Sequence, residues 1–334
     1  MPIPTALTES LAIKYPILLA PMDVVADARL TAAVSAAGGL GLLGGGYGDA
    51  AWLERELDLL AQQSVRFGVG FITWSMAKQP RLLDLALERK PVAIILSFGD
   101  PAPFVDRIKT SGARLICQIQ TVTMAREAVA AGADIIVAQG TEAGGHGSSR
   151  GLIALLPEVV DAVGSKVPIV AAGGIADGRG LSAALMLGAS GVLLGTRFYA
   201  TREAAVAEAA KERVRRATGD QTARSIVFDL SRRNVWPAPF TGRCLVNQHL
   251  ERWLGREVEL LRQLDLESPR YLAARAAGDY DVAAVIAGES AGMVGDIAGA
   301  AEVIERIVSE AAALLTAGAT RVNNGAARAR PDGV

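Results

Sequence analysis

Short, almost uninterrupted apolar blocks are the feature that most restricts what this chain can fold into. Eight of them recur along the sequence, and each is rich in Val, Ile, Leu or Ala instead of alternating apolar with polar residues. Continuous blocks of this kind are typical of parallel strands that are buried on both faces. The predicted strands cover residues 17–22, 40–44, 67–71, 92–97, 114–119, 135–139, 169–172 and 191–195.

Between these blocks the sequence has helical patterns, and glycines mark where a helix ends and the next strand begins. At three similar junctions a glycine follows a helical pattern, at Gly38, Gly132 and Gly188. A left-handed glycine ends a helix without steric cost, so these residues are predicted helix stops. Thr121 and Asp177 are predicted N-caps of two of the helices. Strands alternating with helices in this way predict an α/β fold, a (β/α)8 TIM barrel of about 250 residues. An open doubly wound sheet is the alternative.

The last third of the chain no longer alternates apolar blocks with helical patterns. Residues 203–216 predict a charged helix, an irregular stretch follows, and helical patterns return at 249–262 and 269–277. An Ala-rich amphipathic pattern at 299–315 could be the last helix of the barrel. The predicted parts are the barrel over 1–207 plus 299–320, a small, mostly helical substrate or lid domain over 208–298 near the barrel mouth, and a flexible tail over 321–334.

Charge and cysteine content narrow the class of protein. The chain has 334 residues with 34 basic and 35 acidic side chains, which gives a net charge of −1. It therefore has no excess of positive charge that would attract nucleic acid or acidic lipid. Two unrelated cysteines and two distant histidines predict neither a disulfide framework nor a metal site. The first residues lack a signal-peptide pattern, and no apolar run approaches the roughly 20 residues that span a bilayer. We therefore expect a cytoplasmic protein.

Glycines at the ends of the last two predicted strands indicate a phosphate site. Gly173 and Gly174 follow the seventh strand, and Gly195 and Thr196 follow the eighth. Bare backbone amides allow an anion to approach closely, and barrels commonly bind phosphate between these two loops. Either pair alone could consist of glycines that a tight turn requires. Glycines at the ends of two consecutive strands, which we call glycine exits, favour a phosphate site instead.

His146 is the predicted catalytic residue. It lies in a glycine-rich loop, 138–151, after the sixth strand, where nothing nearby in sequence offers an apolar partner for its ring, so we expect a mobile loop. An imidazole at a barrel mouth is suited to proton transfer near neutral pH or to hydrogen bonding with an anion. His249, beside Leu250 and Trp253 in a helical pattern, fits a packed histidine instead.

Other strand ends add candidate contacts for a ligand. Gln118 lies in the fifth strand and Gln139 ends the sixth, and their amides could bind ribityl hydroxyls or a heteroaromatic edge, or be satisfied buried amides. Ala20, Pro21 and Met22 end the first strand and offer backbone groups and an apolar face to a planar ring.

One further glycine pattern is interpreted as structural. Gly39, Gly41 and Gly44 spell GxGxxG, but this run follows a helix and forms the second predicted strand. A dinucleotide fingerprint must instead follow a strand and open a helix. The sequence also contains neither a GKS/GKT phosphate loop nor a GxSxG nucleophile elbow.

Taken together, these segments resemble the nitronate monooxygenase family, formerly called 2-nitropropane dioxygenases, within the FMN-dependent barrel oxidoreductases. The resemblance covers about residues 17–201, and a helical second domain after the eighth strand also matches. The resemblance rests on these segments, in chain order: PILLAPM with AAVSAAGGLGLLGGG, FGVGF, QGTEAGGHG, VAAGGI and LGTRF.

The resemblance implies that FMN lies at the barrel mouth. Its phosphate would contact the glycine exits, its ring would lie over residues 20–22, and both glutamines, together with Gly144 and Gly145, would contact the cofactor. His146 would face a nitro compound or nitronate, which dioxygen converts to a carbonyl compound and nitrite. Similar sequences include NAD(P)H-dependent FMN reductases of the enoyl-acyl carrier protein and quinone types, and these remain the alternative. A barrel that only binds flavin would leave His146 without a role.

Overall fold

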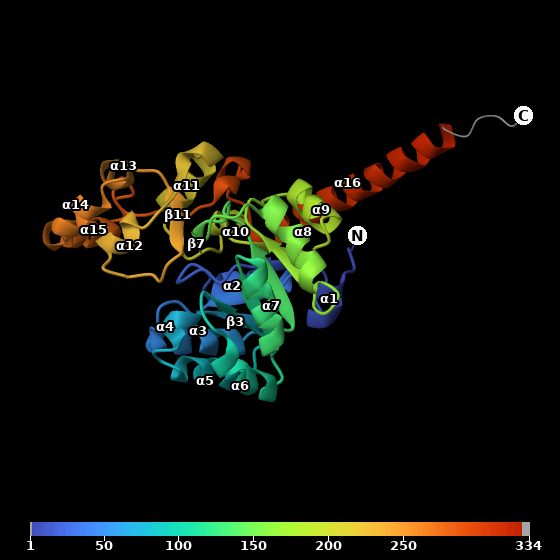
Figure 1. Cartoon of the computed structure of the whole chain (residues 1–334), viewed down its shortest axis with the longest axis horizontal. Coiled ribbons are helices and arrows are strands. Elements are labelled where there is room, and N and C mark those ends of the chain that lie inside the picture. Colours follow the sequence, from blue (N-terminus) through green and yellow to red (C-terminus); the bar gives the residue numbers. More distant parts are fainter. Residues whose placement is uncertain (1, 329–334) are drawn as a thin grey trace, which may run out of the picture.

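The eight predicted strands form one parallel barrel surrounded by helices (Figure 1). The computed structural model describes residues 2–328, with side chains described up to Thr320. The barrel strands are β1 (Ile17–Leu19), β2 (Gly41–Gly44), β3 (Phe67–Ile72), β4 (Ala93–Ser97), β5 (Arg114–Ile119), β6 (Ile135–Gln139), β8 (Ile169–Ala172) and β9 (Gly191–Leu194).

The sheet closes on itself. Its strand order is β1-β9-β8-β6-β5-β4-β3-β2, and a parallel bridge between Leu18 and Leu40 joins the two ends. The alternative of an open doubly wound sheet is therefore wrong, and the predicted (β/α)8 barrel is confirmed. The first strand ends at Leu19, three residues earlier than predicted, which leaves Ala20 to Met22 free of the sheet at the barrel mouth.

Burial on both faces explains why the strands are continuous apolar blocks. Successive side chains of a strand point to opposite faces, and here one set fills the barrel while the next packs under the helices. In β6, for example, Ile135 and Val137 belong to the inner cluster, and Ile136 and Ala138 belong to the outer one. All four are inaccessible to solvent, so neither face tolerates a polar residue.

Helices connect the strands and end where the glycines predict. The three stop glycines Gly38, Gly132 and Gly188 have φ of 99°, 110° and 93°. These values are the left-handed conformation that a glycine helix stop requires. Thr121 and Asp177 accept hydrogen bonds from the first turns of α7 and α9, which confirms both N-caps.

The helices that connect the strands are α2 (Ala28–Ala36), α3 (Ala50–Ala61), α4 (Thr73–Met76), α5 (Arg81–Glu88), α6 (Val105–Thr110), α7 (Val122–Ala131), α8 (Leu152–Val163) and α9 (Gly178–Met186). Three further elements are α1 (Ala6–Leu11) before the barrel, η1 (Ala102–Phe104) before α6 and α10 (Thr196–Tyr199) after β9.

Helix α16 (Ala300–Arg328) completes the ring by packing against α9 and α2. Its buried side chains include Val303, Ile307 and Ala311, after which it runs on beyond the barrel (Figure 1). The helix is longer than the predicted pattern, so the tail predicted over 321–334 is helical as far as Arg328. Residues 329–334 lie outside the described residues, and the flexibility of that end stays a prediction.

The segment between α10 and α16 contains more than the predicted helices. Its elements are α11 (Glu208–Arg216), η2 (Gly219–Gln221), β10 (Thr222–Ser225), α12 (Val227–Ser231), β11 (Thr241–Leu245), α13 (Gln248–Trp253), α14 (Glu257–Arg262), α15 (Leu264–Ala277) and η3 (Glu289–Met293). Strands β10 and β11 form an antiparallel sheet with β7 (Gly145–Gly147), which belongs to the loop after β6. The second domain is thus joined to the predicted catalytic loop by a shared sheet. The domain boundaries themselves stay a prediction.

The glycines of the GxGxxG run are structural, as predicted. A Cβ on Gly41 would lie 2.0 Å from the backbone oxygen of Thr31, and one on Gly44 would lie 2.2 Å from that of Met22. These glycines allow helix α2 and the end of β1 to lie directly against β2.

Both cysteines are buried, and neither is suited to act as a nucleophile. Burial raises the pKa of the Cys117 thiol, and separately that of Cys244, to about 12. Cys117 belongs to the hydrophobic core around the barrel.

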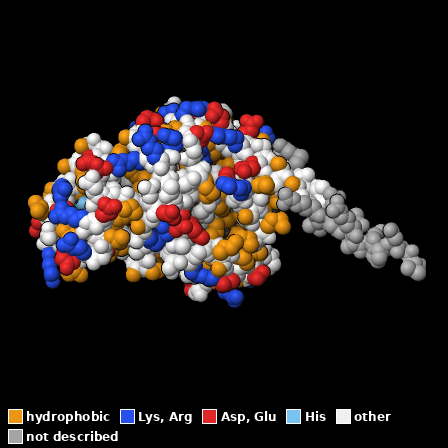
Figure 2. All heavy atoms as spheres, turned by 90° about the horizontal axis from the view of Figure 1, so that it is seen from above, with side chains coloured by type: hydrophobic (Ala, Val, Ile, Leu, Met, Phe, Trp, Pro, Cys, Tyr) orange, Lys and Arg blue, Asp and Glu red, His pale blue; other side chains and the backbone are white. Residues whose placement is uncertain are grey.

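Acidic and basic side chains alternate over the face shown in Figure 2, as the balanced composition leads one to expect. Within the described part of the chain, no helix combines the length and the apolar composition needed to cross a bilayer.

Candidate active site

A cavity of about 440 Å³ lies where all eight barrel strands end. Its volume falls within the range of roughly 300–1,000 Å³ that is usual for small-molecule sites. The barrel supplies its floor through the carboxyl ends of the strands and the loops that follow them, which is where barrel enzymes place their active sites. The second domain supplies the opposite wall through Arg232, Trp236, Tyr271, Arg275, Tyr280, Ala283, Ala284, Ile286 and Ser290.

Every residue predicted to bind the cofactor or to act in catalysis lines this one cavity. These residues come from β1, β5, β6, β8, β9 and the loops after them, and they are brought together because parallel strands of a barrel end at the same side. They are Ala20, Pro21, Met22, Gln118, Gln139, Gly144, Gly145, His146, Gly173, Gly174, Gly195 and Thr196.

The glycine exits of β8 and β9 present unpaired donors. Within the described residues, no acceptor is found for the amide N–H groups of Gly173, Gly174, Gly195 and Thr196. Gly173 and Gly174 have φ of 108° and 69°. Residues other than glycine rarely adopt such values. Four unpaired amides in residues that line one cavity are suited to bind an anion such as a phosphate.

Gly195 leaves room that a side chain would fill. A Cβ built there would meet only Ala20 Cβ at 3.5 Å and Met22 Sδ at 3.8 Å, so the space beside it belongs to the cavity. The side chain of Thr196 has a different task, because its Oγ1 accepts a hydrogen bond of 2.9 Å from the Gly288 amide of the second domain.

The two glutamines differ in their hydrogen bonding. Gln139 donates from Nε2 to the His146 carbonyl at 2.9 Å and accepts from Gln120 Nε2 at 2.8 Å. It is thus a largely satisfied buried amide, and it holds the backbone of the histidine strand. Gln118 is half-buried and makes no side-chain hydrogen bond to another described residue, so its amide is free to bind a ligand.

His146 is firmly held, and the expectation of a mobile loop without an apolar partner is wrong. Strand β7 pairs this residue with Gly242, and the ring stacks on Trp236 with centroids 3.4 Å apart and planes 6° apart. The side chain is only 9% exposed. The partner was not visible in the sequence because Trp236 lies in the second domain.

Asp229 orients the imidazole. Its Oδ2 lies 2.9 Å from His146 Nε2, and its Oδ1 accepts a hydrogen bond of 2.6 Å from Arg232. Because Oδ1 already accepts from Arg232, we assign Oδ2 as the acceptor for Nε2, which then carries the hydrogen and donates it. Nδ1 then keeps its lone pair and has no hydrogen-bond partner among the described residues. This nitrogen is available to take a proton.

Burial keeps the imidazole neutral. Desolvation lowers the pKa of His146 below its ordinary value of 6.5, and the nearby charges of Arg232 and Arg224 act in the same direction. The hydrogen bond and charge of Asp229 oppose this shift without reversing it. A buried, oriented and neutral imidazole has the properties of a general base near neutral pH.

Two arginines hold the loop that carries His146. Arg224 donates to the carbonyls of Thr141 and Ala143 at 2.9 and 3.0 Å, and Arg243 donates to Thr141 at 3.0 Å. Burial lowers the pKa of Arg224 to about 10, yet it remains charged at neutral pH. Gly144 packs against the second domain, since a Cβ there would lie 2.6 Å from the Gly288 nitrogen.

The residues that sequence reasoning missed all come from outside the barrel strands. Asp229, Arg232 and Arg224 belong to no short motif, and Asp229 is 83 positions from His146. Tyr47, on the loop after β2, also lines the cavity, and burial raises its pKa to about 12. The only available signal was the irregular stretch around Trp236, which interrupts the helical pattern of the second domain.

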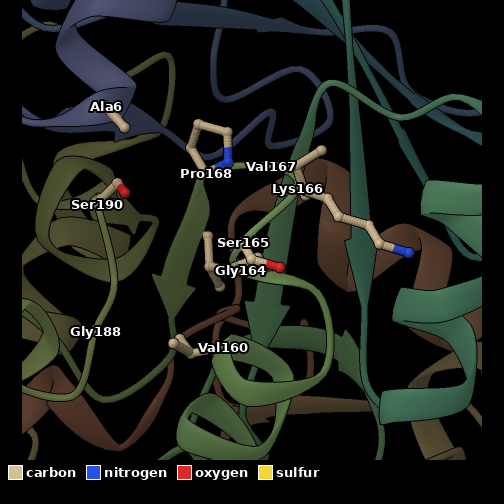
Figure 3. Close-up of a pocket in the computed structure, with 10 residues that line it drawn as sticks. Ala6, Val160, Gly164, Ser165, Lys166, Val167, Pro168, Gly188 and Ser190 are labelled. Carbon is tan, nitrogen blue, oxygen red and sulfur yellow. The ribbon is translucent and has the colours of Figure 1, made fainter.

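A second hollow of about 270 Å³ lies at the opposite end of β8 and lacks comparable chemistry. Lys166 is its one charged lining residue, and its side chain points away from the other lining residues (Figure 3). We therefore assign the functional site to the cavity at the strand ends.

Known proteins resemble this chain over most of its length. The sequence model described as nitronate monooxygenase matches residues 4–69 and 67–310. The chain belongs to the nitronate monooxygenase family. Nitronate monooxygenase npaC of Metarhizium robertsii is 35% identical over 91% of this chain and 93% of its own length. An indene-carboxyl-CoA dehydrogenase of Mycobacterium tuberculosis is 31% identical over 92% of this chain and 96% of its own.

Solved structures show the same architecture. FabK from Thermotoga maritima has a TM-score of 0.85 and 30% identity, covering 96% of this chain and 99% of that one. Nitroalkane oxidase from Streptomyces ansochromogenes has a TM-score of 0.79 and 29% identity, covering 94% and 99%. Like other members of the nitronate monooxygenase family, this protein is a flavin-dependent oxidoreductase.

Proposed function

We propose that the enzyme uses FMN to oxidise alkyl nitronates with dioxygen, giving a carbonyl compound and nitrite. The observation that carries the proposal is the Asp229–His146 pair, a buried base that lines the cavity in a chain of this family. A neutral nitroalkane must lose a carbon-bound proton to become a nitronate, and this pair can remove it.

The residues of the cavity fit a flavin mononucleotide. Four unpaired amides at the ends of β8 and β9 would hold its phosphate, and the free amide of Gln118 would contact its polar ring edge or ribityl chain. The side chains of Ala20, Pro21 and Met22 offer an apolar surface for the ring. When bound, the flavin supplies the redox chemistry, and the protein supplies orientation and electrostatics.

The side chains of the site have separate tasks in this proposal. His146 Nδ1 takes the proton from the carbon that bears the nitro group. Asp229 accepts the hydrogen bond from Nε2 and stabilises the imidazolium that forms, as the carboxylate does in other Asp–His pairs. Arg232 donates a hydrogen bond to Asp229 and so fixes its position, and Trp236 excludes water from one face of the ring. With a preformed nitronate no carbon-bound proton has to be removed, so His146 is not needed as a base.

An NAD(P)H-dependent FMN reductase is the second candidate. This candidate is favoured by the similarity of the chain, over nearly its whole length, to a relative named as a CoA dehydrogenase. The same cavity and the same base could serve transfer to a different acceptor.

Spectra and oxygen uptake distinguish the two candidates. We expect the purified protein to show a flavin spectrum and to consume oxygen and release nitrite with propionate-3-nitronate. Anaerobic NADH or NADPH should leave the flavin oxidised. Rapid bleaching by a nicotinamide, followed by reoxidation with a quinone or an enoyl thioester, would favour the reductase and contradict the proposal.

The lowered pKa of His146 predicts the pH dependence of turnover. Because the neutral imidazole is the active form, the acid limb of kcat/KM for a neutral nitroalkane should have its midpoint below pH 6.5, the ordinary value for histidine. Asp229→Asn should move this acid limb to still lower pH, since it removes the carboxylate that favours imidazolium. The measurement is kcat/KM between about pH 5 and 8. An acid limb above pH 6.5, or one that rises in the variant, would contradict the assignment of the base.

A further inference from the structure

One aromatic side chain of the second domain covers the catalytic imidazole. Trp236 lies between α12 and β11, lines the cavity and is 9% exposed. Its ring is parallel to that of His146 at a centroid distance of 3.4 Å. One face of the imidazole is therefore closed to a substrate, which must approach along the remaining free side.

The indole is fixed from several directions. Its Nε1 donates a hydrogen bond of 3.0 Å to the Tyr47 hydroxyl on the loop after β2. The rings of Trp74 and Phe98 meet it edge-on at 5.3 and 5.1 Å. Edge-to-face contact is a favourable geometry for aromatic pairs. These three partners belong to the barrel, so the indole bridges the two domains and forms a rigid wall.

The size of the cavity makes such a wall important. The cofactor and the substrate share a space of about 440 Å³. This volume lies in the lower half of the range for sites that hold one drug-sized ligand. Next to His146 the chain contributes the glycines of β7 and Gly242, which take up little room. Ile286, beside Gly145, is another apolar side chain nearby, but Trp236 is the larger of the two and is the one stacked on the imidazole, so it limits the space on that side.

We propose that Trp236 determines substrate size, so that the site accepts open-chain nitronates and excludes those with a ring at the nitro carbon. The inference rests on the proposed function for the nitronate class. The steric argument itself depends only on the stack and the cavity.

The test compares an unbranched with a cyclic substrate. For 1-nitrobutane and nitrocyclohexane, supplied as nitronates, we expect Trp236→Ala to raise the ratio of cyclic to unbranched kcat/KM by at least about tenfold. Trp236→Phe keeps a smaller ring over the imidazole and should give a smaller rise. Trp253→Phe is the matched control, because Trp253 is also buried in the second domain but does not line the cavity. Its ratio should equal that of the unmodified enzyme.

Binding provides a readout that does not depend on turnover. The neutral nitroalkanes are added without oxygen, and their affinities are taken from the change in the flavin absorbance spectrum. If Trp236→Ala and Trp236→Phe fold, retain flavin and show the original preference in both turnover and binding, the inference is wrong. If the unmodified enzyme turns over neither nitronate, the proposed function fails, and the binding ratio alone decides whether Trp236 sets the size limit.

Discussion

We expect His146→Asn to retain flavin and to lose at least about 10²-fold in turnover of a neutral nitroalkane, the effect of losing a general base. The amide of Asn reaches only the position of Nδ1, where it offers no basic nitrogen, and it is too short to replace the contact of Nε2 with Asp229. A preformed nitronate should be affected much less, because no carbon-bound proton has to be removed. Oxygen uptake with the two substrate forms, normalised to bound flavin, measures the difference.

The second histidine offers a control for this variant. His249 is buried, bonds to Ser231 and does not line the cavity. His249→Asn should therefore leave turnover per bound flavin unchanged. Equal turnover of the neutral nitroalkane by His146→Asn and the unmodified enzyme would remove His146 from the role of base.

Gly195→Val should abolish flavin binding while the protein still folds. Gly195 has a φ of −106°, so a side chain brings no left-handed strain, and its first carbon meets no atom closer than 3.5 Å. The added methyl groups would instead enter the cavity between two of the unpaired amides and displace the phosphate. The flavin absorbance of the purified protein, with a thermal melt to verify folding, measures the outcome.

Gly295→Val is the matched control, since Gly295 is exposed and nothing lies within 4 Å of the added carbon. It should bind flavin normally. Gly174→Val would be a less decisive choice, because Gly174 has a φ of 69°. A side chain in that conformation adds backbone strain to any steric effect. A Gly195→Val protein with its full complement of flavin would show that the phosphate binds elsewhere.

The barrel could be predicted from the sequence because its signals are local. Each strand is a block buried on both faces, and each of three stop glycines adopts the positive φ that its position requires. Strands β5, β6 and β8 have the predicted bounds. The end of β1 was placed too late, because the apolar residues of 20–22 continue the pattern of the strand although they line the cavity.

The second domain was harder to predict because its structure depends on distant partners. Strand β11 pairs with β10 on one side and with β7 on the other, and β7 is three residues of a loop after β6. A short strand with glycine at two of its three positions has no alternating pattern. Such a strand forms only when a partner strand provides the hydrogen bonds.

By itself, the amino-acid sequence determined the barrel, the phosphate-binding glycines as candidates, and His146 as the candidate base. These follow from periodicity and from residue type at strand ends, and parallel strands carry their ends to one side. Only the tertiary structure decided how His146 is used, since the carboxylate of Asp229 and the indole of Trp236 come from a separate domain, 83 and 90 positions along the chain. Hydrogen bonding and ring stacking act over a few ångströms in space, and no local pattern encodes which distant side chain arrives there.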